Sequence, residues 1–120
     1  MSKILIIEDE ETIRRVLKKV LHQEDKNYEI IEAVDGVDGV SKINSNKFDL
    51  ILCDIKMPKK DGIEVLKHIL KECPNTPTIM ISGHGDLETA VESMRIGAFD
   101  YISKPPDLNR LLNSVRSALL

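Results

Sequence analysis

The chain has 120 residues, 42% of them hydrophobic, and carries 17 basic and 20 acidic residues for a formal net charge of −3. This is the size of one compact domain with a single core, and the charge balance gives no general attraction to nucleic acid or to an anionic membrane. With no Trp, two Phe and two Tyr, an aromatic stacking platform for single-stranded nucleic acid is also not expected.

Strand candidates occur in chain order at 4–7, 28–33, 50–53, 78–81 and 99–103. Most are continuously apolar, as in strands that are buried on both faces of a sheet. Longer stretches of helical periodicity separate them, a pattern that indicates parallel strands with helices on both sides. The sequence therefore predicts an α/β domain of five strand–helix pairs.

Apolar residues at three- and four-residue steps predict the helices. Helix two, at 36–44, has the weakest pattern because Gly36 and Gly39 lower its helix propensity. Asp61 and Asp107 are predicted to cap the third and fifth helices. The apolar positions of the other four helices are Ile13, Val16, Leu17, Val20 and Leu21; Leu66, Ile69, Leu70 and Cys73; Leu87, Ala90, Val91 and Met94; and Leu108, Leu111, Leu112, Val115 and Leu119.

The cysteine pattern and the start of the chain bear on location. Cys53 and Cys73 have neither metal-site spacing nor the density of a disulfide scaffold, so a reducing, cytoplasmic compartment is expected. Only four apolar residues, 4–7, precede Glu8, too few for a signal peptide core or a membrane span. No membrane partner is expected.

Polar residues follow the predicted strands, and in doubly wound sheets ligands bind outside these carboxyl ends. Right-handed crossovers allow strands one, three, four and five to lie side by side and to bring such residues to one edge. The residues in question are Glu8 and Asp9 after strand one, Asp54 after strand three, Ser82 and His84 after strand four, and Lys104 after strand five.

Each of these residues also has an ordinary structural interpretation. Acidic residues after a strand are favoured by the dipole of the next helix, and this is the better interpretation of Glu10 and Glu11. Asp54 and Ser82 are also suited to a turn, and Lys104 to solvent. Their joint placement favours a shared site.

Three carboxylates at one edge would repel one another and raise each other's pKa values unless a cation joined them. Oxygen ligands suit a hard divalent ion, and Mg2+ typically takes few protein carboxylates together with a phosphate oxygen. A lysine and a serine hydroxyl would complete the contacts to a phosphoryl group. The residues thus predict a site for Mg2+ and a phosphoryl group.

Four motifs carry a family resemblance over essentially the whole chain: "IIEDE" at 6–10, "CDIKMPKKDG" at 53–62, "ISG" at 81–83 and "DYISKP" at 100–105. In order and spacing they resemble the receiver domain of two-component response regulators. The stretch from "ISGHGD" to "ISKP" most resembles receivers of NtrC/NtrX-type transcriptional activators. The resemblance implies a flavodoxin-like doubly wound (βα)5 sandwich whose five-stranded parallel sheet has the order 2-1-3-4-5.

The resemblance also assigns the acidic residues. Asp54 would be the phosphoacceptor, and Glu8, Asp9, Asp54 and the backbone carbonyl of Lys56 would hold Mg2+ (or Mn2+). Many receivers have two aspartates at the first pair, so Glu8 departs from that version of the motif.

The remaining site residues would handle the phosphoryl group and its effects. Ser82 and Lys104 would contact the phosphoryl oxygens, and the Lys104–Pro105 peptide bond would be cis. Ser82 and Tyr101 would form the switch, although Tyr101 also fits a half-buried strand aromatic. Lys56 and His84 flank the site and are expected to tune dephosphorylation.

As partners, the resemblance implies a histidine kinase or phosphotransfer protein, docked on the first helix near Arg14, Val16 and Leu17. Phosphorylation would bias an output surface of helix four, strand five and helix five, with homodimerisation through that face. An effector domain regulating transcription would follow, making residues 1–120 the N-terminal part of a longer regulator, while the domain itself would contact no nucleic acid. A free-standing receiver that signals by docking stays open.

Two other classes of protein are alternatives to the receiver domain. A haloacid-dehalogenase phosphatase also uses an aspartate nucleophile and Mg2+, but it has a second aspartate two residues on, where this chain has Lys56. A flavodoxin-like FMN protein needs a phosphate loop after strand one, where Glu8 and Asp9 would repel the phosphate. Neither G-x-x-x-x-G-K-S/T nor G-x-G-x-x-G occurs. We expect a signalling domain that assists its own phosphorylation and slow dephosphorylation rather than an enzyme.

Overall fold

The structure is a computed structural model that describes residues 2–83 and 87–120. Its five strands form one parallel sheet of order β2-β1-β3-β4-β5, which confirms the predicted topology. The strands are β1 (Lys3–Ile7), β2 (Glu29–Ala33), β3 (Leu50–Asp54), β4 (Thr78–Ser82) and β5 (Asp100–Ser103). The helices are α1 (Glu11–Glu24), α2 (Gly36–Ser45), α3 (Gly62–Glu72), α4 (Leu87–Ile96) and α5 (Leu108–Ala118).

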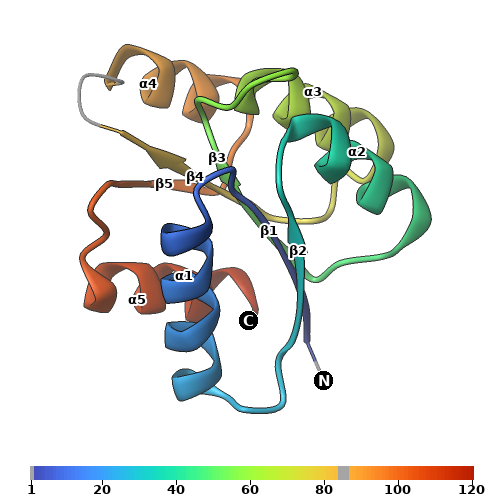
Figure 1. Ribbon diagram of the computed structural model, residues 1–120. Helices are drawn as coiled ribbons and strands as arrows, with labels where there is room; N and C mark the ends of the chain where they lie inside the picture. The colour runs from blue at the N-terminus through green and yellow to red at the C-terminus, as the bar shows by residue number, and fades with distance from the viewer. Residues whose placement is uncertain (1, 84–86) are drawn as a thin grey trace.

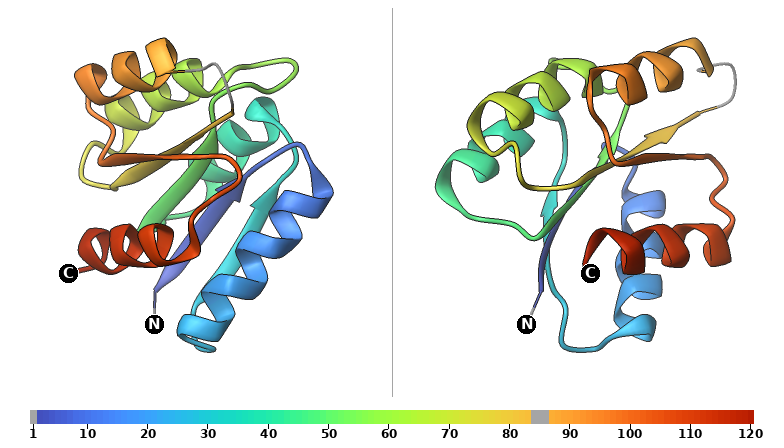
Figure 2. Two further views of the ribbon diagram at one scale, coloured as in Figure 1. Left: turned by 90° about the vertical axis from the view of Figure 1, so that its left-hand side faces the viewer. Right: turned by 180° about the vertical axis from the view of Figure 1, so that it is seen from behind.

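The helices cover the two faces of the sheet in unequal groups (Figures 1 and 2). α1 and α5 lie together on one face, and α2, α3 and α4 lie in sequence across the other. Since each crossover between parallel strands is right-handed, a reversal of strand order places helices on both faces. That reversal lies at β1, between β2 and β3. No helix in the described part of the chain is both long enough and apolar enough to cross a membrane.

Alternate residues of the strands supply the two halves of the core, because successive side chains of a strand point to opposite faces. Under α1 and α5 the sheet contributes Ile4, Ile6, Leu50, Leu52, Ile79, Ile81 and Ile102. Under α2, α3 and α4 it contributes Leu5, Ile7, Ala33, Ile51, Cys53 and Met80. The continuous apolar runs of the sequence therefore reflect burial on both sides.

Helix α2 forms as predicted despite its two glycines. Asp35 caps it, accepting a hydrogen bond from the Asp38 N–H at 2.8 Å. A Cβ at Gly36 would lie 2.0 Å from the backbone oxygen of Lys60, and one at Gly39 would lie 2.6 Å from Ile7 Cδ1. The glycines thus permit close packing of α2 against the β3–α3 loop and the sheet, which offsets their lower helix propensity.

The prediction of a buried apolar face is wrong for most of α4. Of its four apolar positions only Ala90 is buried, whereas Leu87, Val91 and Met94 are exposed. The helix is buried at the small side chains of Ala90 and Ser93, and Ile96 at its end packs against the core, so Leu87, Val91 and Met94 remain at the surface. Val16 on α1 is likewise exposed.

Candidate functional site

The alternation of the core extends past the strands and determines which polar residues meet. Glu8 follows Ile4 and Ile6 by the same two-residue step, Asp54 follows Leu50 and Leu52, and Lys104 follows Ile102. The strand register pairs Ile6 with Leu52, and Asp54 with Ile81, which pairs in turn with Ile102. The three polar side chains are therefore expected above the same half of the core, the one under α1 and α5.

Their contacts agree with this placement. The Lys104 ammonium lies 2.9 Å from Glu8 Oε1 and 3.1 Å from Asp54 Oδ2. The side chains of Glu8, Asp54 and Lys104 are 1%, 3% and 13% exposed. Two buried carboxyl groups thus share one ammonium group at the carboxyl edge of the sheet.

Burial sets the electrostatics of this trio. It raises the pKa of Glu8 from 4.5 to about 7, although Lys104 opposes the shift, and it also raises the pKa of Asp54. Burial alone would lower the pKa of Lys104, but the bonds to Glu8 and Asp54 outweigh it and leave that pKa above its ordinary value. One ammonium group does not offset two buried carboxylates, so the site favours a further cation.

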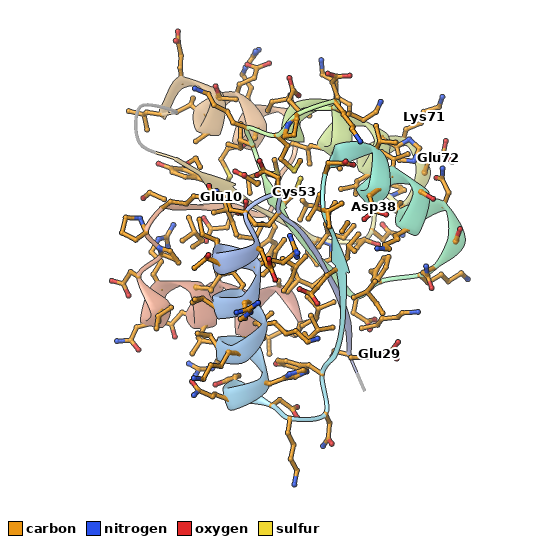
Figure 3. All side chains as sticks on the ribbon, viewed as in Figure 1. Glu10, Glu29, Asp38, Cys53, Lys71 and Glu72 are labelled. Atoms are coloured by element: carbon orange, nitrogen blue, oxygen red, sulfur yellow. The ribbon has the colours of Figure 1, made fainter. Side chains whose placement is uncertain are left out.

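Glu8, Asp9 and Glu10 each offer a carboxylate oxygen, and these oxygens lie within 4.8 Å of one another. The Glu10 N–H donates to Glu8 Oε2 at 3.1 Å, and Glu10 Oε1 lies 3.6 Å from the Lys104 ammonium. Figure 3 shows Glu10 where the chain enters α1. The sequence favours only a helix-dipole role for Glu10 and does not indicate the proximity of this carboxylate to the site.

The donor set fits a hard divalent cation. Besides its ion pair with Lys104, the buried Glu8 Oε1 has no hydrogen-bond partner among the described residues. Carboxylate oxygens gathered at less than 5 Å are the ligands that such ions take in proteins. Asp54 shares Lys104 with Glu8 and therefore belongs to the same constellation.

The β3–α3 loop holds Asp54 in place from the other side. The N–H of Ile55 donates to Ile81 O at 3.0 Å, and the N–H of Gly62 donates to Ile55 O at 2.6 Å. Asp61 caps α3 by accepting from the Glu64 N–H at 3.0 Å, which confirms its predicted role. A Cβ at Gly62 would lie 2.3 Å from the Asp54 carbonyl oxygen, so only glycine fits beside the candidate acceptor.

The other residues predicted for the site lie in different surroundings. Ser82 is buried at the end of β4, and its carbonyl accepts from the Lys104 N–H at 2.7 Å. Tyr101 is half-buried and packs against the core on the side of α2, α3 and α4. The Lys104–Pro105 peptide bond is cis. Lys56 is exposed one residue beyond Ile55, and His84 lies outside the described residues.

Comparison with known proteins identifies the family. Residues 4–116 match the response regulator receiver domain. The chain is 39% identical over 119 residues to the response regulator ArlR of Staphylococcus saprophyticus, covering 99% of this chain and 53% of that protein. It is 37% identical over 119 residues to the regulatory protein AtoC of Escherichia coli K12, covering 99% of this chain and 25% of that protein.

Solved structures agree with these sequence matches. The receiver domain of NtrX from Brucella abortus superimposes with a TM-score of 0.89 at 37% identity, covering 97% of both chains. The chain spans about half the length of ArlR and about a quarter of AtoC.

The family match also decides between the classes left open by the sequence. It excludes the haloacid-dehalogenase phosphatase and the FMN-binding alternative, since the match covers nearly the whole chain with the sheet order and motifs of a receiver. Its relatives include NtrC-type activators such as AtoC, as the sequence resemblance indicated, together with ArlR. This chain belongs to the family of response regulator receiver domains of two-component signalling.

Proposed function

We propose that Asp54 accepts a phosphoryl group from a phosphohistidine of a partner kinase or phosphotransfer protein. The observation that carries the proposal is the position of Asp54, buried at the end of β3 with its Oδ2 3.1 Å from the Lys104 ammonium. A carboxylate oxygen attacks the phosphorus in line as the P–N bond breaks. The bonding electron pair stays on the imidazole, which leaves as a neutral group when its other nitrogen carries a proton.

Lys104 then has two roles. Before transfer it offsets the charge of Glu8 and Asp54, and during transfer its ammonium turns to the phosphoryl oxygens and stabilises their charge. Its low exposure, 13%, strengthens this interaction because little water screens it. The hydroxyl of Ser82, on the adjacent strand β4, donates to another phosphoryl oxygen.

Glu8, Asp9, Asp54 and the backbone carbonyl of Lys56 would hold Mg2+ (or Mn2+) beside the acceptor. When bound, the ion supplies positive charge that offsets the carboxylates and the incoming phosphoryl oxygens. The burial of Glu8, whose Oε1 has only the ion pair with Lys104 among the described residues, and the gathered carboxylates support this assignment.

The phosphorylated state would signal through the surface of α4, β5 and α5. The new phosphoryl oxygens would draw Ser82 toward Asp54, and Tyr101 would turn inward to the space left. Exposed Leu87, Val91 and Phe99 give this surface an apolar character suited to a partner or a second copy of the chain. Lys56 and His84 are proposed to set how quickly water removes the phosphoryl group.

In the whole protein, we propose that this domain controls an attached effector that regulates transcription in the cytoplasm. The names of relatives, among them a transcriptional regulatory protein, and the two free thiols support this context. The domain would turn over no external substrate beyond its own phosphorylation and dephosphorylation. A receiver that signals by docking alone is the alternative, and the length of the encoded protein decides between them.

The proposal is tested with a small phosphodonor and Mg2+, followed by intact-mass measurement. The wild-type domain should gain one phosphoryl group, and Asp54→Asn should gain none. Asp49→Asn is the matched control, because Asp49 precedes the opposite end of β3 and bonds only to Lys3 among the described residues. Phosphorylation of Asp54→Asn, or release of phosphate from assorted monoesters over many turnovers, would contradict the proposal.

A further inference from the structure

Arg14 on α1 reaches back to the segment that carries the acidic cluster. Its Nη1 donates to the backbone carbonyl of Glu8 at 2.8 Å, and its Nε donates to Glu32 Oε1 on β2 at 3.2 Å. The side chain is only 14% exposed, although it belongs to a surface helix. Lys18 Nζ lies 3.4 Å from Glu32 Oε2, so both oxygens of this carboxylate are engaged.

The neighbouring arginine provides an internal contrast. Arg15 is 76% exposed and forms an ion pair with Glu11 on the same helix at 2.7 Å. Such an exposed pair within one helix contributes little to stability. The contacts of Arg14, in contrast, join three elements: the end of β1, α1 and β2.

The backbone N–H of Arg14 also contacts the segment from Glu8 to Glu10. Its N–H donates to the carbonyl of Glu10 at 3.0 Å, an ordinary helix bond that does not depend on the side chain, so the contact specific to arginine is the one from Nη1 to the Glu8 carbonyl. The N–H of Glu8 donates in turn to Ala33 O at 3.0 Å. Of the two peptide groups that flank Asp9, the first is held through the Glu8 carbonyl by Arg14 Nη1 and the second through the Glu10 N–H by Glu8 Oε2, while the Asp9 side chain itself is exposed.

We propose that Arg14 is a positioning residue for divalent-cation binding, which acts by fixing the backbone of Glu8 to Glu10. This inference rests on the proposed function, since it concerns the same metal-binding segment. A hydrogen bond to the backbone of a ligand residue restricts where its carboxylate points, and outer contacts of this kind commonly contribute tenfold or more to metal affinity.

The direction in which Mg2+ affinity changes when Arg14 is removed distinguishes a positioning role from a purely electrostatic one. Arg14 is a cation near an acidic cluster, so on electrostatic grounds its removal would strengthen the binding of Mg2+. If its main action is to hold Glu8 and Asp9 in a binding geometry, removal weakens binding instead. Glu32 reduces the electrostatic effect by neutralising the guanidinium at 3.2 Å.

The test compares Arg14→Ala, Arg14→Lys and the control Arg15→Ala by calorimetric titration with Mg2+ alone at pH 8. Arg14→Ala should weaken Mg2+ affinity roughly tenfold. Arg14→Lys should lose roughly threefold, because a single ammonium group does not reproduce a guanidinium fork that bonds Glu8 and Glu32 together. Arg15→Ala should bind Mg2+ as the wild type does.

A second readout needs neither metal nor kinase. In the metal-free protein, Arg14→Ala should speed amide hydrogen exchange at Glu8 and Glu10, whose N–H groups donate to Ala33 O and Glu8 Oε2, while amides in the centre of the sheet exchange as in the wild type. Faster exchange over the whole sheet would instead indicate a general loss of stability and overturn the inference.

The results distinguish this inference from the proposed function. If the wild type binds Mg2+ and Arg14→Ala binds it equally or more tightly, the inference is wrong and the proposed function stands. If the wild type binds no Mg2+, both are wrong. A small phosphodonor in a parallel rate measurement avoids any effect of Arg14 on kinase docking.

Discussion

Lys104 and Asp54 lie 3.1 Å apart although they are 50 positions apart in the chain and extend from strands that are not neighbours. β4 separates β3 from β5, so the lysine spans a whole strand to reach Asp54. It also lies 2.9 Å from Glu8 Oε1. Among the described residues, Lys104 is thus the cation that both buried carboxylates of this site share.

Replacing Lys104 with methionine should change three measurable quantities. The metal-free domain should lose about 3 kcal/mol of unfolding free energy at pH 8, because two buried carboxylates lose their partner. Mg2+ should bind more tightly, since a competing positive charge is gone. Phosphorylation by a small phosphodonor should slow, because the ammonium no longer stabilises the transferred oxygens.

Lys67→Met is the matched control, because Lys67 is an exposed residue of α3. It should change the unfolding free energy by less than about 0.5 kcal/mol and leave the Mg2+ affinity and the phosphorylation rate as in the wild type. Equal or weaker Mg2+ affinity in Lys104→Met would show that the lysine does not compete with the cation.

Glu8 should give the metal-free domain a particular pH dependence. Its pKa is raised from 4.5 to about 7 by burial, so the folded state holds a proton that the unfolded state releases between these values. The contribution of Glu8 protonation to the free energy of unfolding is therefore fully present below pH 4.5 and is lost as the pH rises through 7. Denaturant unfolding of wild type and Glu8→Gln across this range measures the difference.

The same protonation should compete with Mg2+. Apparent Mg2+ affinity should rise from about pH 6 to about pH 8, as Glu8 gives up its proton. Glu8→Gln should bind Mg2+ weakly, with less dependence on pH. A wild-type affinity that stays constant over this range would argue against a raised Glu8 pKa.

Gly62→Ala should damage both stability and the site. The added Cβ would lie 2.3 Å from the carbonyl oxygen of Asp54 and 2.6 Å from Ile55 Cα, and these backbone atoms cannot move without shifting the acceptor. We expect a loss of about 3 kcal/mol in unfolding free energy and slower phosphorylation.

Gly39→Ala is the informative comparison for Gly62→Ala. There the Cβ would meet side-chain atoms of Ile7, Cδ1 at 2.6 Å and Cγ1 at 3.0 Å, rather than the backbone of Asp54 and Ile55, and alanine gains about 1 kcal/mol of helix propensity. Gly39→Ala should therefore cost less and leave the phosphorylation rate intact. Equal losses of unfolding free energy and of phosphorylation rate in the two variants would show that the contact of residue 62 with Asp54 does not affect the site.

Much of the fold could be predicted from the sequence because burial on both faces leaves a continuous apolar run in each central strand. Leu50 to Cys53 is such a run, and Asp54 interrupts it where the strand reaches the edge of the sheet. Asp61 and Asp107 could be recognised as caps from their place before a helical pattern, and both accept the expected backbone hydrogen bond.

Periodicity gave less information where helices pack through small residues. Leu87, Val91 and Met94 recur at helical steps, yet Ala90 forms the buried contact of α4. A pattern of apolar residues does not distinguish a face that packs in the core from one left at the surface. On a receiver domain, such an exposed face is suited to a protein partner.

The finer contacts of the site depend on distances that sequence spacing does not encode. Glu10 follows the first strand closely enough to be assigned to the start of a helix, but its approach to Lys104 at 3.6 Å depends on how β5 ends. The bond from Arg14 to the Glu8 carbonyl depends on the turn between β1 and α1. Such contacts become visible only when the elements are placed relative to one another.

The proposed role of Asp54 is tested most directly by locating the phosphoryl group on the protein. After reaction with a small phosphodonor and Mg2+, borohydride reduction should convert the phosphorylated aspartate to homoserine, which peptide mass spectrometry assigns to a position. We expect modification at Asp54 in the wild type and none in Asp54→Asn. Modification at Asp9 or Asp61 with Asp54 unmodified would contradict it.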